Sequence, residues 1–353
     1  MAVTPVDAGA LVEDIGAFDA LIDARSPAEF AEDHLPGALN WPVLDDAQRH
    51  EVGTLYKQVG ALEARKLGAV LASRNIAAHL EAHLADKPRD WRPLVYCWRG
   101  GQRSGSLALV LGQIGFRTGQ LAGGYKAFRA VVRAQLAMMP GALQLRVLCG
   151  RTGTAKTRLL HALAAEGAQT IDLEGLARLR ASCLGAMPVE PQPSQKAFET
   201  ALWSAMRGLD PQRPVYLESE SVRIGRLQVP EALIGAMHGQ GRCLRVEMTL
   251  DARVAHLMRD YDFFVRDPEP LCALLDTLVP LRGRELVAAW QAAARRGDWT
   301  DCLHGLLEQH YDPLYDRSIR TNYPDYDTAA QVLLPDASDT SLRETARRLL
   351  APG

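Results

Sequence analysis

The chain lacks several features that would narrow its class at once. Its six cysteines form no Cys-x-x-Cys pair, which argues against a zinc site and against a disulfide framework. No stretch approaches the roughly 20 consecutive apolar residues that a membrane span needs. The first residues, MAVTPVDAGALVED, have no basic segment followed by an apolar one. We therefore expect reduced thiols, no membrane contact and a cytoplasmic location.

The chain also lacks a strong charge of either sign. Lysine and arginine number 40 and aspartate and glutamate number 42, for a formal net charge of -2. An anionic polymer such as RNA would therefore have to bind a local basic surface. Hydrophobic residues make up 47% of the 353 residues and charged residues 23%, which is typical of a folded globular enzyme. A chain of this length is expected to form two domains.

Short apolar runs alternate with helical stretches along the chain, which predicts an α/β protein with parallel sheets. Strands are predicted at residues 18–23, 93–96, 145–149, 169–173, 214–218 and 244–250. A predicted helix over 125–139 is stopped by Pro140-Gly141, so we place the boundary between a domain of residues 1–139 and one of 140–353. Beyond Asp251 the pattern is mostly helical.

A cysteine opens the loop after the predicted strand 93–96, in the stretch Cys97-Trp-Arg-Gly-Gly-Gln-Arg103-Ser104. Glycines let successive backbone N–H groups converge on one point, and the following helix adds its positive dipole end. Arg99 and Arg103 would add charge-assisted donors. We predict that this loop stabilises the nucleophilic thiolate of Cys97. The alternative is a buried structural cysteine with exposed arginines beside it.

A second loop, from Gly150 to Thr157, follows the predicted strand 145–149 and precedes a predicted helix. It matches the phosphate-loop pattern G-x-x-x-x-G-K-[ST] except that alanine replaces the second glycine. The residues predicted to bind a diphosphate are Gly150, Arg151, Thr152, Gly153, Thr154, Ala155, Lys156 and Thr157. Lys156 would neutralise the phosphates, and the Thr157 hydroxyl would hold Mg²⁺ if a metal is used. The extra methyl group of Ala155 is expected to alter the loop where positive φ is common, and the alternative is an ordinary strand-to-helix turn.

Acidic residues end the predicted strand 214–218. Glu218 or Glu220 would bind Mg²⁺ or accept a proton, although an acidic strand end is also common without either role. Arg223 and Arg226 follow, where they would pair with these carboxylates or contact phosphate.

The first half of the chain resembles the rhodanese family over most of residues 10–135. The resemblance rests on Asp23-Ala-Arg-Ser-Pro-Ala-Glu-Phe30, on His34-Leu-Pro-Gly-Ala-Leu-Asn40 and on Leu121-Ala-Gly-Gly-Tyr125. It implies that Cys97 attacks a donor and carries sulfur or selenium. The Cys-x5-Arg spacing is one residue longer than in typical sulfurtransferases and equals that of rhodanese-like phosphatases. The substrate of the loop could therefore be a donor the size of selenophosphate or a phosphoprotein. The phosphatases usually carry histidine where this chain has Tyr96.

The whole chain resembles the tRNA 2-selenouridine synthases, in which a rhodanese domain precedes a phosphate-loop domain. Besides the cysteine loop, the resembling segments are 171–177, 192–195, 218–225 and 308–315. The departures are Ala155 and the stretch Arg180-Ala-Ser-Cys-Leu-Gly185, where a glycine is expected after the arginine. The resemblance implies replacement of sulfur by selenium in 2-thiouridine at the wobble position of tRNA. It also implies selenophosphate as donor, with a supplier of that donor, and an S-geranyl intermediate made from geranyl diphosphate.

Scattered arginines are the candidates for a tRNA surface, and a polar segment near residue 310 is a candidate for the same pocket. The arginines are Arg178, Arg180, Arg223, Arg226, Arg317 and Arg320, and the polar residues are His310, Tyr311, Asp312 and Tyr315. Solvated arginines and a polar helix end explain the same residues without a function. Two other classes stay open: a cysteine-dependent phosphatase with a regulatory nucleotide-binding domain, and a non-catalytic protein that binds chalcogen or acts as an adaptor.

Overall fold

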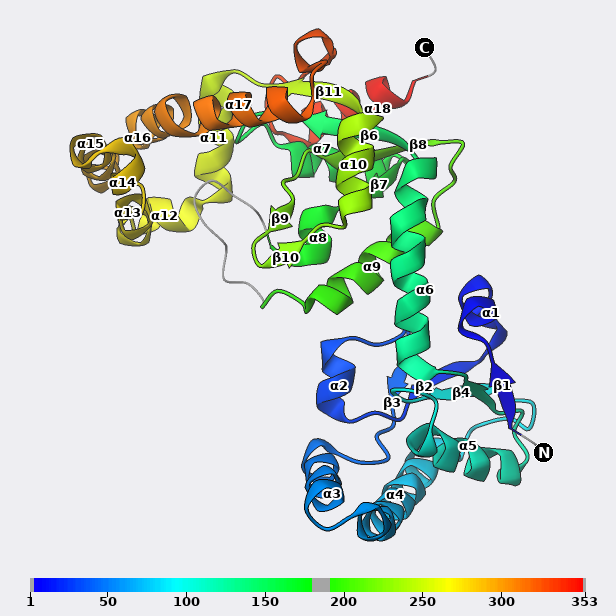
Figure 1. Ribbon diagram of the computed structural model, residues 1–353. Coiled ribbons are helices and arrows are strands. Elements are labelled where there is room, and N and C mark those ends of the chain that lie inside the picture. Colours follow the sequence, from blue (N-terminus) through cyan, green and yellow to red (C-terminus); the bar gives the residue numbers. More distant parts are fainter. Residues whose placement is uncertain (1–2, 180–190, 352–353) are drawn as a thin grey trace. The chain divides into compact units, whose positions relative to one another are not determined.

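The computed structural model describes residues 3–179 and 191–351 (Figure 1). The chain forms two compact units: the first contains Met1–Leu136 and Pro193–Ser204, and the second contains Ala137–Gln192 and Ala205–Gly353. The units divide within three residues of the boundary expected from Pro140-Gly141. The segment 193–204 belongs to the first unit although the predicted boundary assigned it to the second.

The first unit is built on a five-stranded parallel sheet with the strand order β1-β5-β4-β2-β3. The strands are β1 (Thr4–Val6), β2 (Ala20–Asp23), β3 (Leu39–Asn40), β4 (Pro93–Tyr96) and β5 (Gly119–Leu121). The strands predicted at 18–23 and 93–96 are β2 and β4, which pair from Ala20 opposite Pro93 to Asp23 opposite Tyr96. Because the strands are parallel, their carboxyl ends lie at one edge of the sheet, and Cys97 directly follows β4 there.

Helices cover the sheet of the first unit. They are α1 (Ala8–Glu13), η1 (Ile15–Ala17), α2 (Pro27–Glu32), α3 (Asp46–Gln58), α4 (Ala61–His83), α5 (Gln102–Ile114) and α6 (Gly124–Met138). Helix α5 buries Leu107, Ala108 and Leu111, which recur at helical spacing and join Val95 of β4 in one hydrophobic core. Each fully buried leucine of this kind contributes about 1.5–3 kcal/mol. This packing holds the start of α5 beside the cysteine loop.

A buried carboxylate ties helix α9 (Gln195–Arg207) into the first unit. Asp33 is 3% exposed and accepts hydrogen bonds from the hydroxyls of Tyr125 at 2.7 Å and Thr200 at 2.9 Å. The Arg129 Nε lies 3.7 Å from the same carboxylate, and its Nη1 donates to the Thr200 hydroxyl at 2.9 Å. The charge of Asp33 is thus paired and hydrogen-bonded, as a buried carboxylate requires.

Aromatic packing joins α9 to α6 within the same unit. The fully buried Trp203 meets Phe128 edge to face, with ring centroids 5.4 Å apart. The indole N–H of Trp203 donates to the Gln135 side-chain oxygen at 2.7 Å. The tryptophan therefore buries its ring without losing its hydrogen bond.

The second unit is also built on a five-stranded parallel sheet, with the strand order β12-β11-β6-β8-β7. The strands are β6 (Gln144–Cys149), β7 (Gln169–Ile171), β8 (Pro214–Glu218), β11 (Arg242–Glu247) and β12 (Ala330–Leu333), and β9 (Arg223–Ile224) with β10 (Leu227–Gln228) forms an antiparallel pair. The predicted strand 169–173 ends early because Asp172 caps the next helix, and the predicted strand 244–250 ends early because Thr249 does the same. The fold class, two parallel α/β domains, is confirmed.

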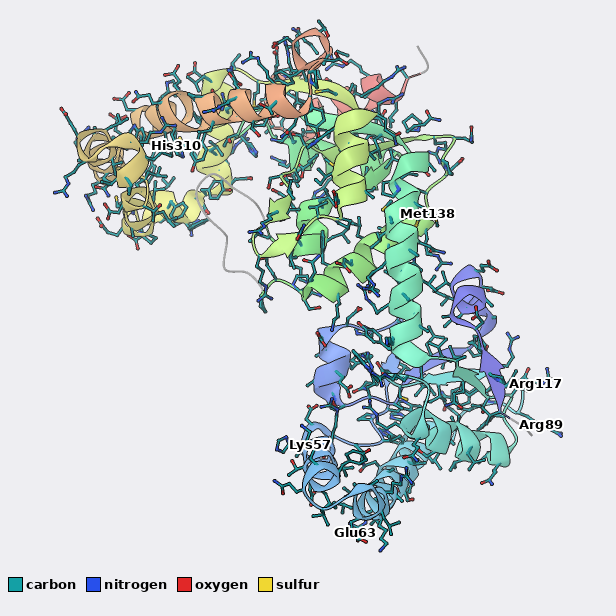
Figure 2. All side chains as sticks on the ribbon, in the orientation of Figure 1. Lys57, Glu63, Arg89, Arg117, Met138 and His310 are labelled. Carbon is teal, nitrogen blue, oxygen red and sulfur yellow. The ribbon has the colours of Figure 1, made fainter. Side chains whose placement is uncertain are left out.

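Helices surround this sheet and continue into a helical part. They are η2 (Met139–Ala142), α7 (Lys156–Ala165), α8 (Leu173–Ala177), α10 (Glu231–Gly239), α11 (Leu250–Asp260), α12 (Asp262–Arg266), α13 (Glu269–Asp276), α14 (Val279–Arg282), α15 (Arg284–Arg295), α16 (Trp299–Leu306), the π-helix η3 (Leu307–Tyr311), α17 (Asp312–Asn322), η4 (Tyr326–Thr328) and α18 (Asp339–Leu350). Helices α11 to α16 share a hydrophobic core that includes Leu257, Trp290 and Leu303. The π-helix, which contains His310, connects α16 to α17 (Figure 2). Within the described ranges, no helix combines the length and apolar character needed to cross a bilayer.

Candidate active site

The cysteine loop is closed by the backbone at the start of α6. The N–H of Tyr125 donates to the carbonyl of Cys97 at 2.8 Å, and the N–H of Lys126 donates to the carbonyl of Trp98 at 3.0 Å. Gly124 has φ of +59°, and a Cβ on it would lie 2.3 Å from the Cys97 carbonyl oxygen. This close approach requires glycine. The Gly-Gly pair that resembles the rhodanese ending therefore fixes the loop that carries the thiol.

The Cys97 thiol lies inside this loop and is 3% exposed as a residue. The Ser104 hydroxyl, in the first turn of α5, donates a hydrogen bond to the Cys97 sulfur at 3.2 Å. Gln120 of β5 donates to the Ser104 oxygen at 3.0 Å and to the Gly100 carbonyl at 2.9 Å. The sulfur thus faces a hydroxyl that a second side chain holds in position.

The two arginines of the loop take different positions. Arg99 is exposed, whereas the Arg103 guanidinium binds Glu29 through Nη1 at 2.6 Å and Nη2 at 3.4 Å. The Arg49 Nε lies 3.1 Å from the same carboxylate. Burial alone would raise the pKa of Glu29, but the hydrogen bond and charge of Arg103, with the charge of Arg49, outweigh it and lower that pKa. Glu29 therefore holds Arg103 beside the loop.

The phosphate loop has the backbone conformation of an anion-binding turn. Gly153 has φ of +81°, and Ala155 has φ of +56° and ψ of +33°, so the alanine occupies the left-handed region that glycine usually fills. A non-glycine residue pays about 1–2 kcal/mol for this conformation. A Cβ on Gly150 would lie 2.8 Å from the Val246 carbonyl oxygen, so that position also requires glycine. The loop thus keeps its shape despite the alanine.

Lys156 begins helix α7 and reaches back over the loop. Its Nζ donates to the Gly150 carbonyl at 2.6 Å and lies 5.8 Å from the ring centroid of Tyr315. The Tyr315 hydroxyl lies 3.3 Å from the Ser219 hydroxyl. The ammonium group is thus placed at the helix N-terminus, where backbone N–H groups and the helix dipole favour an anion.

A buried ion pair holds the phosphate loop from the side of the helical part. Arg253 of α11 donates through Nε to the Thr152 carbonyl at 2.8 Å and through its two terminal nitrogens to Asp312 at 2.9 and 2.6 Å. Arg151 makes a second bidentate pair with Asp316 of α17 at 2.9 and 2.5 Å. The Arg253 side chain is 4% exposed, so its charge depends on Asp312. The hydrogen bond from Arg253 to the Thr152 carbonyl thus holds the loop backbone, and the Arg151 pair ties the loop to α17.

Three glutamates meet next to the start of α7. Oxygen atoms of Glu174, Glu218 and Glu220 lie within 4.8 Å of one another. The Thr157 hydroxyl donates to Glu218 at 2.7 Å and lies 3.4 Å from Glu174. The second carboxylate oxygen of Glu218, a residue only 1% exposed, has no hydrogen-bond partner among the described residues. Carboxylate and hydroxyl oxygens are the ligands that Mg²⁺ prefers, so these groups fit a magnesium ion.

The close carboxylates also change their own acidity. Burial, followed by the charge of Glu174, raises the pKa of Glu218 to about 8. Burial and the charge of Glu174 likewise raise the pKa of Glu220 to about 7. The charge of Lys156 opposes both shifts without cancelling them. The cluster therefore holds protons near neutral pH and would release them to a bound cation.

A cavity of about 390 Å³ joins the phosphate loop to this acidic cluster. It is lined by Lys156, Thr157 and the three glutamates, and by His161 and Tyr261 on its other walls. Its size lies within the range of small-molecule sites, about 300–1,000 Å³. The arrangement offers cations and N–H groups for an anion on one side and carboxylates for a metal on the other.

Comparison with known proteins places this geometry in a family. A family model described as the tRNA 2-selenouridine synthase AAA domain matches residues 143–267, and a rhodanese-like domain model matches residues 5–131. A tRNA 2-selenouridine synthase of Marinobacter nauticus is 35% identical over 332 residues, covering 85% of this chain and 88% of that protein. The chain belongs to the tRNA 2-selenouridine synthase family. A second member, from Alcanivorax borkumensis, is 33% identical over 327 residues, covering 84% of this chain and 88% of its own length.

Among solved structures, the chain is similar to a rhodanese-related protein from Thermoplasma volcanium. The sequence identity is 19%, the TM-score is 0.25, and the match covers 36% of this chain and 92% of that one. The family assignment therefore rests on the sequence relatives and the two domain models.

The arginines predicted for a tRNA surface are dispersed in the second unit. Arg178, Arg223 and Arg317 are exposed, Arg320 pairs with Asp327 at 3.1 Å, and the side chain of Arg226 donates to the Gln192 carbonyl. Arg180 lies outside the described residues. All five members of this set that the structure describes are exposed, and two of them, Arg226 and Arg320, also make the contacts just given.

The polar segment near residue 310 divides into two groups. Asp312 and Tyr315 reach the phosphate loop through Arg253 and Lys156, as described above. His310 instead accepts a hydrogen bond from the Arg282 Nε at 2.9 Å, and burial followed by the Arg282 charge lowers its pKa. Tyr311 packs against the core of the helical part. Among the described residues of this segment, Asp312 and Tyr315 are therefore the ones tied to the phosphate loop.

The sequence did not identify several residues that complete the site. Glu174 lies in segment 171–177, which resembles the family, and it directly follows a predicted strand. These two features could have identified it as a candidate site residue. Arg253, Asp316 and Gln120 carried no such signal, because each acts through a partner more than 15 residues away in the sequence.

Proposed function

We propose that this protein replaces the sulfur of 2-thiouridine at the wobble position of tRNA with selenium, through an S-geranyl intermediate. The observation that carries the proposal is the presence, in one chain, of a cysteine loop and a diphosphate-type loop. The names of the relatives, tRNA 2-selenouridine synthases, support it. Selenophosphate is the proposed donor, so an enzyme that supplies it is a required partner in the cell.

The phosphate loop would bind geranyl diphosphate. The 2-thio sulfur of the uridine attacks C1 of the geranyl group, the C1–oxygen bond breaks, and diphosphate leaves with the electron pair. Lys156 and the loop N–H groups would stabilise the charge of the leaving diphosphate. Mg²⁺ held by Thr157 and the three glutamates would neutralise part of that charge.

The cysteine loop would serve the second step. Alkylation turns the sulfur into a good leaving group. The selenium of selenophosphate would attack C2 of the base, the C2–sulfur bond would break, and geranyl thiolate would leave and take up a proton. Water would then cleave the selenium–phosphorus bond and release phosphate. We assign selenium handling to Cys97, because its sulfur lies within a closed loop at the positive end of α5. Arg99 and Arg103, which follow Cys97 in the same stretch of sequence, would donate to the selenophosphate anion, and Arg103 would share its guanidinium with Glu29.

The first experiment tests the phosphate loop. Geranylation of thiolated tRNA is measured by mass spectrometry of its nucleosides, for the full chain and for Lys156→Ala. We expect a loss of at least about 100-fold, the scale on which a transition-state charge stabiliser acts. Lys57→Ala, in exposed α3 (Figure 2), is the matched control. Undiminished geranylation by Lys156→Ala would remove the loop from the reaction.

The second experiment tests the cysteine loop. Cys97→Ala should abolish selenation of S-geranylated tRNA and leave geranylation intact, while Cys243→Ala changes neither. Survival of selenation would exclude Cys97 from the mechanism. Hydrolysis of phosphotyrosine or phosphothreonine that depends on Cys97 would instead favour the cysteine-dependent phosphatase, with its loop of equal length.

A further inference from the structure

An exposed histidine lies on helix α7, one turn beyond Thr157. Thr157 and His161 are four residues apart, so their side chains lie on the same face of the helix. Both line the cavity of about 390 Å³ that joins the phosphate loop to the three glutamates. The side chain of His161 is 60% exposed, so it reaches both the cavity and the surrounding water. The proposed binding of diphosphate and metal leaves this histidine unused.

An aspartate sets the hydrogen-bonding state of the His161 ring. The ring Nε2 lies 2.8 Å from Oδ2 of Asp172. A carboxylate only accepts hydrogen bonds, so Nε2 carries the hydrogen and, in the neutral ring, Nδ1 carries the lone pair. Within the ranges that the structure describes, Nδ1 has no hydrogen-bond partner. This nitrogen is therefore available to accept a proton.

Asp172 is itself held by the helix that it caps. Its Oδ1 accepts a hydrogen bond from the Gly175 N–H at 2.7 Å, and its backbone carbonyl accepts one from the Leu176 N–H at 3.0 Å. A Cβ on Gly175 would collide with the Asp172 carboxylate, so this close approach requires glycine. One carboxylate oxygen thus anchors the aspartate and the other binds the imidazole. A carboxylate in this position orients a histidine base and stabilises its protonated form.

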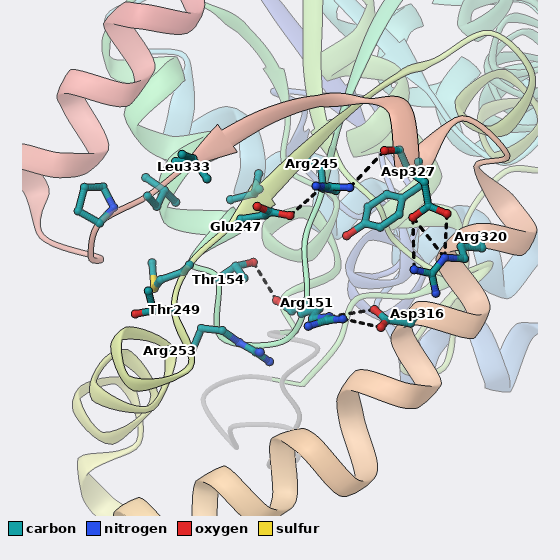
Figure 3. Close-up of a pocket in the computed structure, with 15 residues that line it drawn as sticks. Arg151, Thr154, Arg245, Glu247, Thr249, Arg253, Asp316, Arg320, Asp327 and Leu333 are labelled. Atoms are coloured by element: carbon teal, nitrogen blue, oxygen red, sulfur yellow. Dashed lines mark hydrogen bonds and ion pairs between the residues drawn. The ribbon is translucent and has the colours of Figure 1, made fainter.

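Other titratable groups around the phosphate loop are less suited to accept a proton. A larger cavity of about 560 Å³ lies on the other side of the loop, and Figure 3 shows its Asp316 paired with Arg151 and its Asp327 paired with Arg320. A carboxylate bound to a guanidinium holds a proton weakly. A second histidine of the smaller cavity, His256, is only 4% exposed, whereas a base has to exchange its proton with water between turnovers.

The proposed alkylation has to release a proton. The base of 2-thiouridine carries a hydrogen on N3, and the neutral S-alkyl product does not. As the sulfur bonds to C1 and the C1–oxygen bond breaks, the N3–H electron pair stays on N3, a double bond forms between C2 and N3, and the C2–sulfur bond becomes single. An acceptor for the proton therefore makes the sulfur a better nucleophile.

We infer that Nδ1 of His161 is the general base that takes the N3 proton, with Asp172 as its positioning residue, an inference that rests on the proposed geranyl transfer. His161 lies five residues beyond Lys156, a rise of about 7.5 Å along α7. This rise is comparable with the length of the atom chain from the leaving oxygen through C1 and the sulfur to N3. The protonated ring stays paired with Asp172 and then passes its proton to water.

Replacement of the histidine tests this inference. Geranylation rates of thiolated tRNA are measured at saturating geranyl diphosphate for the full chain and for His161→Gln, whose amide can still donate to Asp172. The rate should fall at least about 100-fold, the scale of general base catalysis. The affinity for geranyl diphosphate, measured by calorimetry, should change less than about threefold. His50→Gln, at an exposed histidine of α3, is the matched control and should change neither quantity.

Two further measurements separate a base from a structural contact. Imidazole added to His161→Ala should raise its rate at least about tenfold, because the free base replaces the missing side chain. Asp172→Asn keeps a residue that caps α8. It should lower the rate about tenfold or more in the wild type but less than about twofold in the His161→Gln background, because the aspartate acts through the imidazole.

Several results would overturn the inference while the loop proposal stands. They are a loss of rate in His161→Gln smaller than the expected one, no rescue of His161→Ala by imidazole, and a loss of affinity equal to the loss of rate, which would assign His161 to binding. An equal effect of Asp172→Asn in both backgrounds would limit Asp172 to its cap and overturn its positioning role. Failure of the wild type to geranylate thiolated tRNA, or geranylation unaffected by Lys156→Ala, would instead refute the proposed function itself.

Discussion

Glu218 gives the sharpest prediction, because one oxygen of its buried carboxylate has no hydrogen-bond partner in the described part of the chain and two acidic side chains lie next to it. Its pKa of about 8 exceeds the ordinary value of 4.5. Between these values the folded chain binds more protons than the unfolded chain, so stability falls as the pH rises through the interval. The full difference corresponds to about 5 kcal/mol. Glu174 and Glu220 share the repulsion, so replacing Glu218 alone should recover about 2 kcal/mol or more.

The test compares the free energy of unfolding at about pH 5 and about pH 9, without divalent ions, for the wild type and for Glu218→Gln. Glutamine keeps an oxygen that can accept from the Thr157 hydroxyl, so the comparison isolates the charge. The wild type should lose about 2 kcal/mol more than the variant over this pH interval. Calorimetry is suitable because it separates the transitions of the two units. Glu344→Gln, on the exposed face of α18, is the control.

Parallel pH curves for the wild type and Glu218→Gln would refute the reasoning. They would mean that the carboxylate ionises in the folded chain as easily as in the unfolded one. A difference that is equally large at both pH values would instead indicate altered packing.

Three further predictions concern the same unit. Glu220 and Glu218, with pKa values of about 7 and about 8, must lose their protons before they bind a cation. The affinity for Mg²⁺, measured by titration calorimetry, should therefore rise between about pH 6 and pH 8. An affinity that does not change with pH would contradict the metal site. Asp312→Asn should cost about 3–5 kcal/mol in urea unfolding, because it leaves the buried guanidinium of Arg253 without its counter-ion, and a loss below about 1 kcal/mol would show that the pair is dispensable. Arg317→Ala should weaken tRNA binding less than about tenfold and reduce its salt slope by about 1 in filter-binding assays, and an unchanged slope would place that arginine outside the tRNA surface.

Local chemistry made the two loops predictable from the sequence. In each loop an apolar run is followed by a short stretch that contains two glycines, with Cys97 before them in one loop and Lys156 after them in the other. Such a stretch predicts a strand-to-helix turn from the local sequence alone. The strands β4 and β8 match the predicted ranges because all of β4 and residues 215–217 of β8 are buried and apolar. The phosphate loop also tolerates its alanine, since Ala155 adopts the left-handed backbone that the missing glycine would have supplied.

Long-range pairing limited the remaining predictions. The edge strand β12 was missed because only Val332 of its residues is buried, so the segment has no strand-like pattern. Arg253 contacts Thr152 and Asp312 across 101 and 59 residues of sequence, and no spacing rule brings such partners together. Glu174 lies in a five-residue helix whose start is fixed by the Asp172 cap, and its meeting with Glu218 depends on the pairing of β7 with β8.

The assignment of residues 193–204 to the first unit has a consequence for biosynthesis. Residues 1–136 leave the ribosome first. The Trp203 ring, which packs against Phe128, and the Thr200 hydroxyl, which donates to Asp33, are translated only later. The amino-terminal half therefore cannot reach its final packing until part of the carboxyl-terminal half has been translated. A truncated chain that ends near residue 139 would lack Trp203 and Thr200, the partners of Phe128 and Asp33.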